Sequence, residues 1–258
     1  MPRLSANIGI LFQERPFLDR FKAAADAGFA AVECWTPYNI PIAEIAARLA
    51  EAGIPLIGIN GPMGDPKQGD MGLAGIPGRE REFDDSITLA LDYATELNAR
   101  HIHVMAGNAA GLNPTECLVA YRGNLARAAQ RAEAAGITLV IEPINRRDRP
   151  TYLLGSCALA AEIIDDIGSP RLKMMFDFYH MQINEGDVTR LFAAHLDRIG
   201  HIQIAAVPSR AEPDEGELNY GFILREIDRL GWQGFVGAEY QPRTTTEAGL
   251  GWREKVLG

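Results

Sequence analysis

Four acidic or amide side chains stand at the ends of four apolar, strand-like runs of this chain. Glu142 follows Thr-Leu-Val-Ile, Asp177 follows Leu-Lys-Met-Met-Phe, Gln203 lies within His-Ile-Gln-Ile, and Glu239 follows Phe-Val-Gly-Ala. A carboxylate at the end of a buried run is costly unless a cation or a hydrogen-bonding partner compensates its charge. If the four runs converge, they place three negative charges and a carbonyl oxygen around one point. We therefore predict a divalent-cation site, and an all-oxygen ligand set favours Mg²⁺ or Mn²⁺ over Zn²⁺.

Glu142 and Glu239 are predicted to be the catalytic pair. Alternation along each run turns both side chains toward the same face of the sheet, where the runs end. Two carboxylates beside a small substrate can take a proton from one carbon and deliver one to the neighbouring carbon. The alternative is a pair of structural carboxylates bound to arginines, although neither run carries an obvious internal partner.

Three further residues are predicted to bind substrate. His180 follows Asp177 by three positions and is expected to polarise a substrate oxygen, the alternative being a buried histidine that supports the site. Arg210, in the loop after the Gln203 run, is expected to clamp a carboxylate through two hydrogen bonds. A solvated loop arginine is the alternative there. Glu33, at the end of another apolar run, is expected to line the pocket wall.

Short apolar runs alternate with amphipathic stretches along the whole chain. Predicted strands are Ser5–Leu11, Ala30–Trp35, Pro55–Asn60, His101–Ala106, Thr138–Glu142, Leu172–Phe178, His201–Ala205 and Phe235–Glu239. Predicted helices are Pro16–Ala27, Ile42–Ala52, Arg79–Asn98, Pro114–Ala135, Ser156–Ile167, Asp187–Ile199, Tyr220–Leu230 and Thr246–Val256. This alternation indicates parallel strands joined by right-handed crossovers.

The predicted fold class is a single (β/α)8 TIM barrel that spans residues 1–258 as one domain. The 258 residues match the roughly 250 that such a barrel typically needs. An open, doubly wound sheet is the alternative, although no Gly-rich nucleotide-binding motif follows a strand. The long connections follow the strands, and loops on that side of a barrel build active sites. The sequence thus favours an enzyme with its site on one rim.

Composition excludes several classes of partner. A net charge of −9 argues against a nucleic-acid surface. No apolar run approaches the roughly 20 residues of a membrane span, and the first residues lack the apolar core of a secretory signal. The three cysteines are widely spaced, which indicates buried thiols in a reducing compartment. We therefore predict a cytoplasmic protein that binds neither nucleic acid nor membrane, acts on a small anionic substrate and is compatible with a homo-oligomer.

Several segments resemble the hydroxypyruvate isomerase family of the xylose-isomerase-like TIM barrels. They are Ile-Glu-Pro-Ile-Asn at 141–145, Phe-Asp-Phe-Tyr-His-Met-Gln at 176–182, Gly-His-Ile-Gln-Ile-Ala at 200–205, Gly-Glu-Leu-Asn-Tyr at 216–220 and Glu-Tyr-Gln-Pro-Arg-Thr-Thr-Thr-Glu-Ala-Gly-Leu at 239–250. With Ser-Ala-Asn at 5–7 and Ile-Pro-Gly-Arg-Glu at 76–80, the resemblance extends over nearly the full length.

The resemblance implies an aldose–ketose type isomerisation that interconverts hydroxypyruvate, a small keto acid, and 2-hydroxy-3-oxopropanoate. It places the family's two catalytic glutamates on Glu142 and Glu239, and the metal ligands of the wider superfamily on those two residues with Asp177 and Gln203. Sugar epimerases of that superfamily usually carry histidine where Gln203 stands, which implies weaker metal binding here.

Other enzymes remain as alternatives. The segment His-Val-Met-Ala-Gly at 103–107 is similar to the 2-oxo-tetronate isomerases, a sister group, whereas Glu-Pro-Ile-Asn is similar to hydroxypyruvate isomerases. A ketose 3-epimerase would use the same barrel without a carboxylate clamp. A DNA-repair nuclease would need several metal-binding histidines and a basic face, and the chain has five histidines and an acidic balance. A non-catalytic binding barrel is the last alternative.

Overall fold

The computed structural model describes residues 2–257, and its eight strands form one closed parallel barrel with strand order β1 to β8. The strands are β1 (Arg3–Asn7), β2 (Ala31–Cys34), β3 (Leu56–Asn60), β4 (His101–His103), β5 (Thr138–Ile141), β6 (Leu172–Asp177), β7 (Ile199–Ile204) and β8 (Phe235–Ala238). Leu4 of β1 pairs with Val236 of β8, which closes the ring. The predicted TIM-barrel fold class is therefore confirmed, and the open sheet is excluded.

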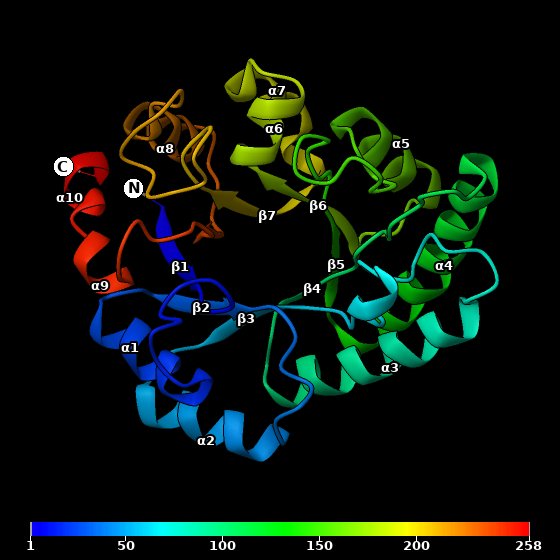
Figure 1. Ribbon diagram of the computed structural model, residues 1–258, viewed down its shortest axis with the longest axis horizontal. Helices are drawn as coiled ribbons and strands as arrows, with labels where there is room; N and C mark the ends of the chain where they lie inside the picture. Colours follow the sequence, from blue (N-terminus) through cyan, green and yellow to red (C-terminus); the bar gives the residue numbers. More distant parts are fainter. Residues whose placement is uncertain (1, 258) are drawn as a thin grey trace.

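The helices surround the strands as an outer ring (Figure 1). They are α1 (Arg20–Asp26), α2 (Ile42–Ala52), α3 (Glu80–Glu96), α4 (Pro114–Ala135), α5 (Cys157–Ile167), α6 (Phe178–Asn184), α7 (Val188–His195), α8 (Tyr220–Arg229), α9 (Thr246–Gly249) and α10 (Trp252–Leu257). Short 3-10 turns are η1 (Phe17–Asp19), η2 (Pro66–Gln68) and η3 (Leu196–Arg198). Within residues 2–257 no helix is both long enough and apolar enough to cross a membrane.

The ends of the helices follow from local sequence. Helix α2 ends on Gly53 with φ 63°, and α4 ends on Gly136 with φ 73°. This left-handed conformation is open to glycine without steric cost and closes the last helical turn before the next strand. The N-terminus of α4 is capped by Asn113, whose side chain accepts a hydrogen bond from the Thr115 backbone N–H.

The structure differs from the predicted elements mainly where strands give way to catalytic-side loops. The run predicted as Ser5–Leu11 is a strand only as far as Asn7, and this strand begins earlier, at Arg3. The run His101–Ala106 is a strand only over His101–His103. Helix α6 was not predicted: it begins directly after β6 because Asp177 caps it, accepting a hydrogen bond from the Tyr179 backbone N–H at 2.9 Å. The apolar residues of Phe178–Asn184 continue directly from those of β6. The alternation expected of a strand therefore extends into the helix and hides the boundary between them.

The main core lies between the outer faces of the strands and the helices, and it includes Cys34 and Cys157. All three cysteines are buried free thiols, as predicted. Three aromatic rings illustrate its packing. The ring centroid of Phe176 in β6 lies 5.0 Å from that of Phe178 in α6 and 5.4 Å from that of Phe192 in α7. The interior of the barrel is different, because serine, glutamate, histidine and glutamine side chains fill it. These polar layers lead up to the carboxyl ends of the strands.

We expect Phe176→Ala to lower the free energy of unfolding by about 3–5 kcal/mol, because it removes a ring that is fully buried between β6 and two helices. Chemical denaturation followed by circular dichroism measures this loss. Phe222→Ala on α8 is the matched control, since Phe222 is 46% exposed and its loss should cost no more than about 0.5 kcal/mol. Equal effects of the two changes would contradict the assignment of the core.

Candidate functional site

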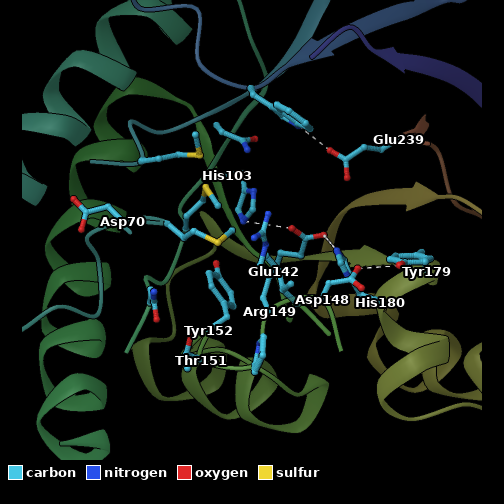
Figure 2. Close-up of a pocket in the computed structure, with 18 of the residues that line it drawn as sticks. Asp70, His103, Glu142, Asp148, Arg149, Thr151, Tyr152, Tyr179, His180 and Glu239 are labelled. Atoms are coloured by element: carbon cyan, nitrogen blue, oxygen red, sulfur yellow. Dashed lines mark hydrogen bonds and ion pairs between the residues drawn. The ribbon is translucent and has the colours of Figure 1, made fainter. Parts of the chain in front are cut away.

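A cavity of about 910 Å³ opens at the carboxyl ends of the strands. Its wall comes from segments that follow β2 to β8, and includes Trp35, Asn60, Asp70, His103, Met105, Asn108, Glu142, Asp148, Arg149, Tyr152, Tyr179, His180, Arg210 and Glu239. Figure 2 shows Glu142 and His180 on one side of this cavity and Glu239 across from them. The site therefore lies on the rim that the long strand-to-helix loops build.

The barrel brings the four predicted metal ligands to its carboxyl end. Glu142 directly follows β5, Asp177 ends β6, Gln203 lies in β7 next to Asp177 in the strand register, and Glu239 directly follows β8. All four side chains are buried. The four therefore lie on, or directly after, four consecutive strands of the barrel.

Within residues 2–257, three buried oxygen atoms of this group lack any hydrogen-bond partner: Oε1 of Glu142, Oδ2 of Asp177 and Oε1 of Gln203. A buried acceptor without a donor loses the hydration it had in water and gains nothing in return. A divalent cation coordinated by these oxygens would remove that cost, so the donor set fits a hard metal ion. Glu142 and Asp177 with His180 also form a group whose ligand atoms lie within 4.8 Å of one another.

Glu239 is in a different state, because hydrogen bonds already occupy both of its carboxylate oxygens. Its Oε1 accepts from Asn7 Nδ2 at 2.7 Å and from Trp35 Nε1 at 3.0 Å. Its Oε2 accepts from a terminal guanidinium nitrogen of Arg210 at 2.8 Å. Four oxygen ligands were expected at the cation site, and the structure leaves free oxygens on three of the four residues.

The two glutamates differ in electrostatic environment. Burial raises the pKa of Glu142 well above its ordinary value, and the negative charges of Glu239 and Asp177 raise it further. Burial also raises the pKa of Glu239, but Arg210 and the Trp35 hydrogen bond oppose that rise. Environments that separate two carboxyl pKa values in this way allow one group to hold a proton while the other is ionised.

His180 faces the carboxylates of Glu142 and Asp177 through one ring nitrogen. Its Nδ1 lies 2.7 Å from the Asn145 side-chain nitrogen and also accepts the Asn145 backbone N–H at 3.3 Å. Its Nε2 lies 3.6 Å from Asp177 Oδ2 and 3.8 Å from Glu142 Oε1. Because Asn145 donates to Nδ1, the neutral ring carries its proton on Nε2, which points at the carboxylates. Burial and the charge of Arg210 hold the pKa of His180 well below its usual range.

The other two predicted substrate-binding residues are placed differently from each other. Arg210 lines the cavity, ion-pairs with Glu239 and lies over the Tyr179 ring at 5.0 Å, so part of its donor capacity is committed within the protein. Glu33 lies in the barrel interior, where its carboxylate accepts hydrogen bonds from Ser5, His201 and Gln203. This placement differs from the expectation that Glu33 lines the wall, because side chains of β1 and β7 hold its carboxylate inside the barrel.

Sequence reasoning missed several residues of the cavity. Tyr179 donates its hydroxyl to Asp148 Oδ2 at 2.9 Å, and Asp148 in turn receives a hydrogen bond from Asn145, so these residues support His180. Arg149 lines the cavity and forms no ion pair within the described part of the chain. The available signal was the dense run of polar residues in the loop after Glu142.

His103, the last residue of β4, also lines the cavity. Its Nε2 has no hydrogen-bond partner among the described residues and lies 3.7 Å from Glu142 Oε2 (Figure 2). Burial lowers the pKa of His103 to about 3. A neutral imidazole edge therefore faces the carboxylate of Glu142 from β4.

The chain is similar to several known proteins over most or all of its length. Residues 21–256 match the model of the xylose isomerase-like TIM barrel family. The chain is 47% identical over its full length to a 2-oxo-tetronate isomerase of Cupriavidus necator, of which it covers 100%. It is 42% identical over 98% of its length to the hydroxypyruvate isomerase of Escherichia coli, of which it covers 99%. A crystal structure from Brucella melitensis, described as an AP endonuclease of family 2, superposes with a TM-score of 0.96 at 40% identity, covering 98% of both chains.

The buried carboxylates generate a prediction about pH. Burial raises the pKa of Asp177 to about 7, whereas an aspartate in an unfolded chain ionises near ~4. A raised folded-state pKa contributes stability that is fully present below the unfolded value and is lost as the pH rises through the folded value. In a chelator, we therefore expect the melting temperature to fall between about pH 4 and pH 7, and to fall less in Asp177→Asn.

A saturating divalent cation should remove most of this fall in the wild-type protein, since the cation stabilises the ionised carboxylate. Scanning calorimetry across the pH series measures both effects. The same fall in wild type and Asp177→Asn would contradict the burial of a titrating carboxyl group at this position.

Proposed function

The chain belongs to the xylose isomerase-like TIM barrel family, and we propose that it is an aldose–ketose type isomerase that interconverts hydroxypyruvate and 2-hydroxy-3-oxopropanoate. The observation that carries this proposal is the pair Glu142 and Glu239, which face one cavity in different electrostatic environments beside three unpartnered oxygens. The relatives that match over the full length are named as isomerases of short oxo acids. We further propose that the chain acts as a single barrel domain in the cytoplasm.

Glu142, Asp177 and Gln203 would hold a Mg²⁺ or Mn²⁺ ion through their free oxygens, with Glu239 facing the same ion. When bound, the ion supplies Lewis-acid stabilisation of negative charge that develops on the substrate oxygens. The all-oxygen donors favour these hard cations. Asp177 keeps its other oxygen on the N-terminus of α6, which fixes the direction of the free one.

Proton transfer between adjacent carbons is assigned to the two glutamates. In the direction that starts from hydroxypyruvate, Glu239 removes a proton from C3, and the resulting enediolate receives a proton at C2 from Glu142. The hydroxyl proton on O3 is lost and one is gained on O2, so the product is an isomer of the substrate. A cation at Glu142 would bring its raised pKa back toward the working pH, which suits a group that gives and takes protons. The roles exchange when the reaction runs in reverse.

The neighbouring histidine and tyrosine have a positioning part in this proposal. The Nε2 proton of His180 points into the space between Glu142 and Asp177, where it can donate to a substrate oxygen. Asn145 fixes this tautomer through Nδ1, and Asp148 with Tyr179 holds Asn145 in place. The ring therefore needs no rearrangement when substrate arrives.

A second candidate is a 2-oxo-tetronate isomerase, which performs the same proton transfer on a longer acid. The cavity of about 910 Å³ exceeds what a three-carbon acid fills, and the 47% identical relative carries that name. A ketose 3-epimerase is less well supported, because two guanidinium groups, Arg149 and Arg210, line the cavity and an uncharged sugar would gain little from them.

Proton NMR in D₂O, with the metal-free protein and after addition of Mg²⁺ or Mn²⁺, tests this function. We expect formation of 2-hydroxy-3-oxopropanoate from hydroxypyruvate, faster with the cation, and much slower turnover of ketohexoses. Preference for 2-oxo-tetronate over hydroxypyruvate would select the second candidate. Turnover of ketohexoses alone would reject both.

We expect Glu142→Gln and Glu239→Gln each to lower kcat by at least ~100-fold, since general acid–base catalysis contributes roughly 10²–10⁴. The amides keep the size of the side chains, so the barrel should remain folded, as circular dichroism would show. Glu217→Gln is the control, because Glu217 carries the same group outside the cavity lining. A wild-type rate in either cavity variant would remove that glutamate from the mechanism.

The two cavity arginines should differ in kinetic effect. Arg210→Ala should raise KM for hydroxypyruvate and also lower kcat, because it removes the guanidinium that holds Glu239. Arg149→Met should raise KM for the acid by about tenfold or more with little change in kcat, because a charge-assisted contact is worth roughly 1.5–3 kcal/mol. Arg147→Met, an exposed neighbour outside the cavity lining, is the control. Equal losses on acid and sugar substrates would show that neither arginine reads a carboxylate.

A further inference from the structure

A second cluster of ligand-type side chains lies in the barrel interior. Glu33, His101 and His201 are buried and bring their ligand atoms within 4.8 Å of one another. The ring centroids of His101 and His201 lie 4.4 Å apart, with the ring planes tilted by 31°. The function proposed above leaves this cluster unused, although one of its members contacts the cation site.

Hydrogen bonds within the protein already satisfy the Glu33 carboxylate. Oε1 accepts from the Ser5 hydroxyl at 3.0 Å, and Oε2 lies 2.9 Å from His201 Nε2 and 3.0 Å from Gln203 Nε2. An ionised carboxylate only accepts hydrogen bonds, so the facing nitrogen of His201 must carry its proton. This cluster is therefore a hydrogen-bond network whose acceptor oxygens are occupied, and we do not assign a second metal to it.

The orientation of the Gln203 amide follows from the same property of the Glu33 carboxylate. Because Glu33 accepts only, the amide must turn its NH₂ group toward Glu33. Its carbonyl oxygen is thereby directed away from Glu33, and this Oε1 is buried without a partner. The strand register places Gln203 beside Asp177, whose Oδ2 is also unpartnered. The bond to Glu33 thus decides which end of the amide is available to a cation.

The backbone of β8 makes room for this contact. A Cβ atom on Gly237 would lie 2.1 Å from Glu33 Oε1 and 3.1 Å from Gln203 Cγ. Gly237 pairs with Gln203 on one side and with Ser5 on the other. Glycine at this position lets the Glu33 carboxylate reach across the interior to β7, and any larger residue would compete with it for the same space.

We propose that Glu33 is a positioning residue for the cation site: it holds the Gln203 amide with its oxygen toward the metal. This inference rests on the proposed divalent-cation site. A flipped amide would present its NH₂ group to the cation, which repels rather than coordinates it. Residues that orient metal ligands typically contribute 10–100-fold to metal affinity.

The test is calorimetric titration of Mn²⁺ into the chelator-treated, full-length protein. We expect Glu33→Gln to weaken Mn²⁺ binding by about 10-fold or more. Glu33→Asp keeps the charge but withdraws the acceptor by one methylene, and should weaken binding as well. Ser5→Ala removes a donor to Glu33 without touching the Gln203 contact, and should stay within about threefold of wild type. Melting curves in chelator show whether each variant is folded.

A double-mutant cycle separates orientation from simple charge. If Glu33 acts through the amide, Glu33→Gln should have no further effect on Mn²⁺ affinity in a Gln203→Ala background. Additive losses, or wild-type affinity in Glu33→Asp, would overturn the proposal, and the aspartate variant decides the matter if Glu33→Gln fails to fold. Absence of Mn²⁺ binding in the wild-type protein would instead remove the proposed cation site, and this inference with it.

Discussion

The constraint on which this site depends is the burial of negative charge. Glu33, inside the barrel, and Glu142, Asp177 and Glu239, at its carboxyl end, are each at most 7% exposed, so water cannot solvate them freely. Uncompensated carboxylates in such surroundings are strongly destabilising, so each needs a donor, a proton or a cation. The protein supplies donors to Glu33 and Glu239 and leaves oxygens of Glu142 and Asp177 without any. This difference in hydrogen bonding leaves Glu142 and Asp177 as the carboxylates that are available to a cation.

The fold provides the geometry for this arrangement. Parallel strands in a closed barrel end at a common rim, so residues far apart in the sequence meet there. Asp177 is both the last residue of β6 and the cap of α6, which occupies one oxygen and aims the other. Arg210 neutralises Glu239 from the loop after β7 and stacks on Tyr179 from α6. Positive charge therefore reaches the rim from loops, while the strands carry the acids.

Sequence patterns were sufficient for the parts of the structure that repeat. The alternation of apolar runs and amphipathic stretches predicted eight strands and the barrel, and the residues ending those runs predicted the four side chains that meet at its rim. The patterns failed where local capping overrides periodicity: helix α6 follows β6 without a break, so Phe178 was assigned to the strand. They also did not predict hydrogen-bond partners. Partners depend on how deep a side chain lies in the barrel, and that depth depends on strand register. Glu33 was expected at the pocket wall for this reason, and the role of Asn145 could not be foreseen.

The proposed cation site depends on three unpartnered oxygens on adjacent strands, and binding of a cation to them can be observed directly. A crystal of the chelator-treated protein soaked in Mn²⁺, with diffraction recorded at a wavelength where manganese scatters anomalously, would locate the ion. The proposed cation site predicts one dominant anomalous peak within coordination distance, about 2.1–2.2 Å, of Glu142 Oε1, Asp177 Oδ2 and Gln203 Oε1. A peak at Glu33, His101 and His201 instead, or none within the barrel, would contradict it.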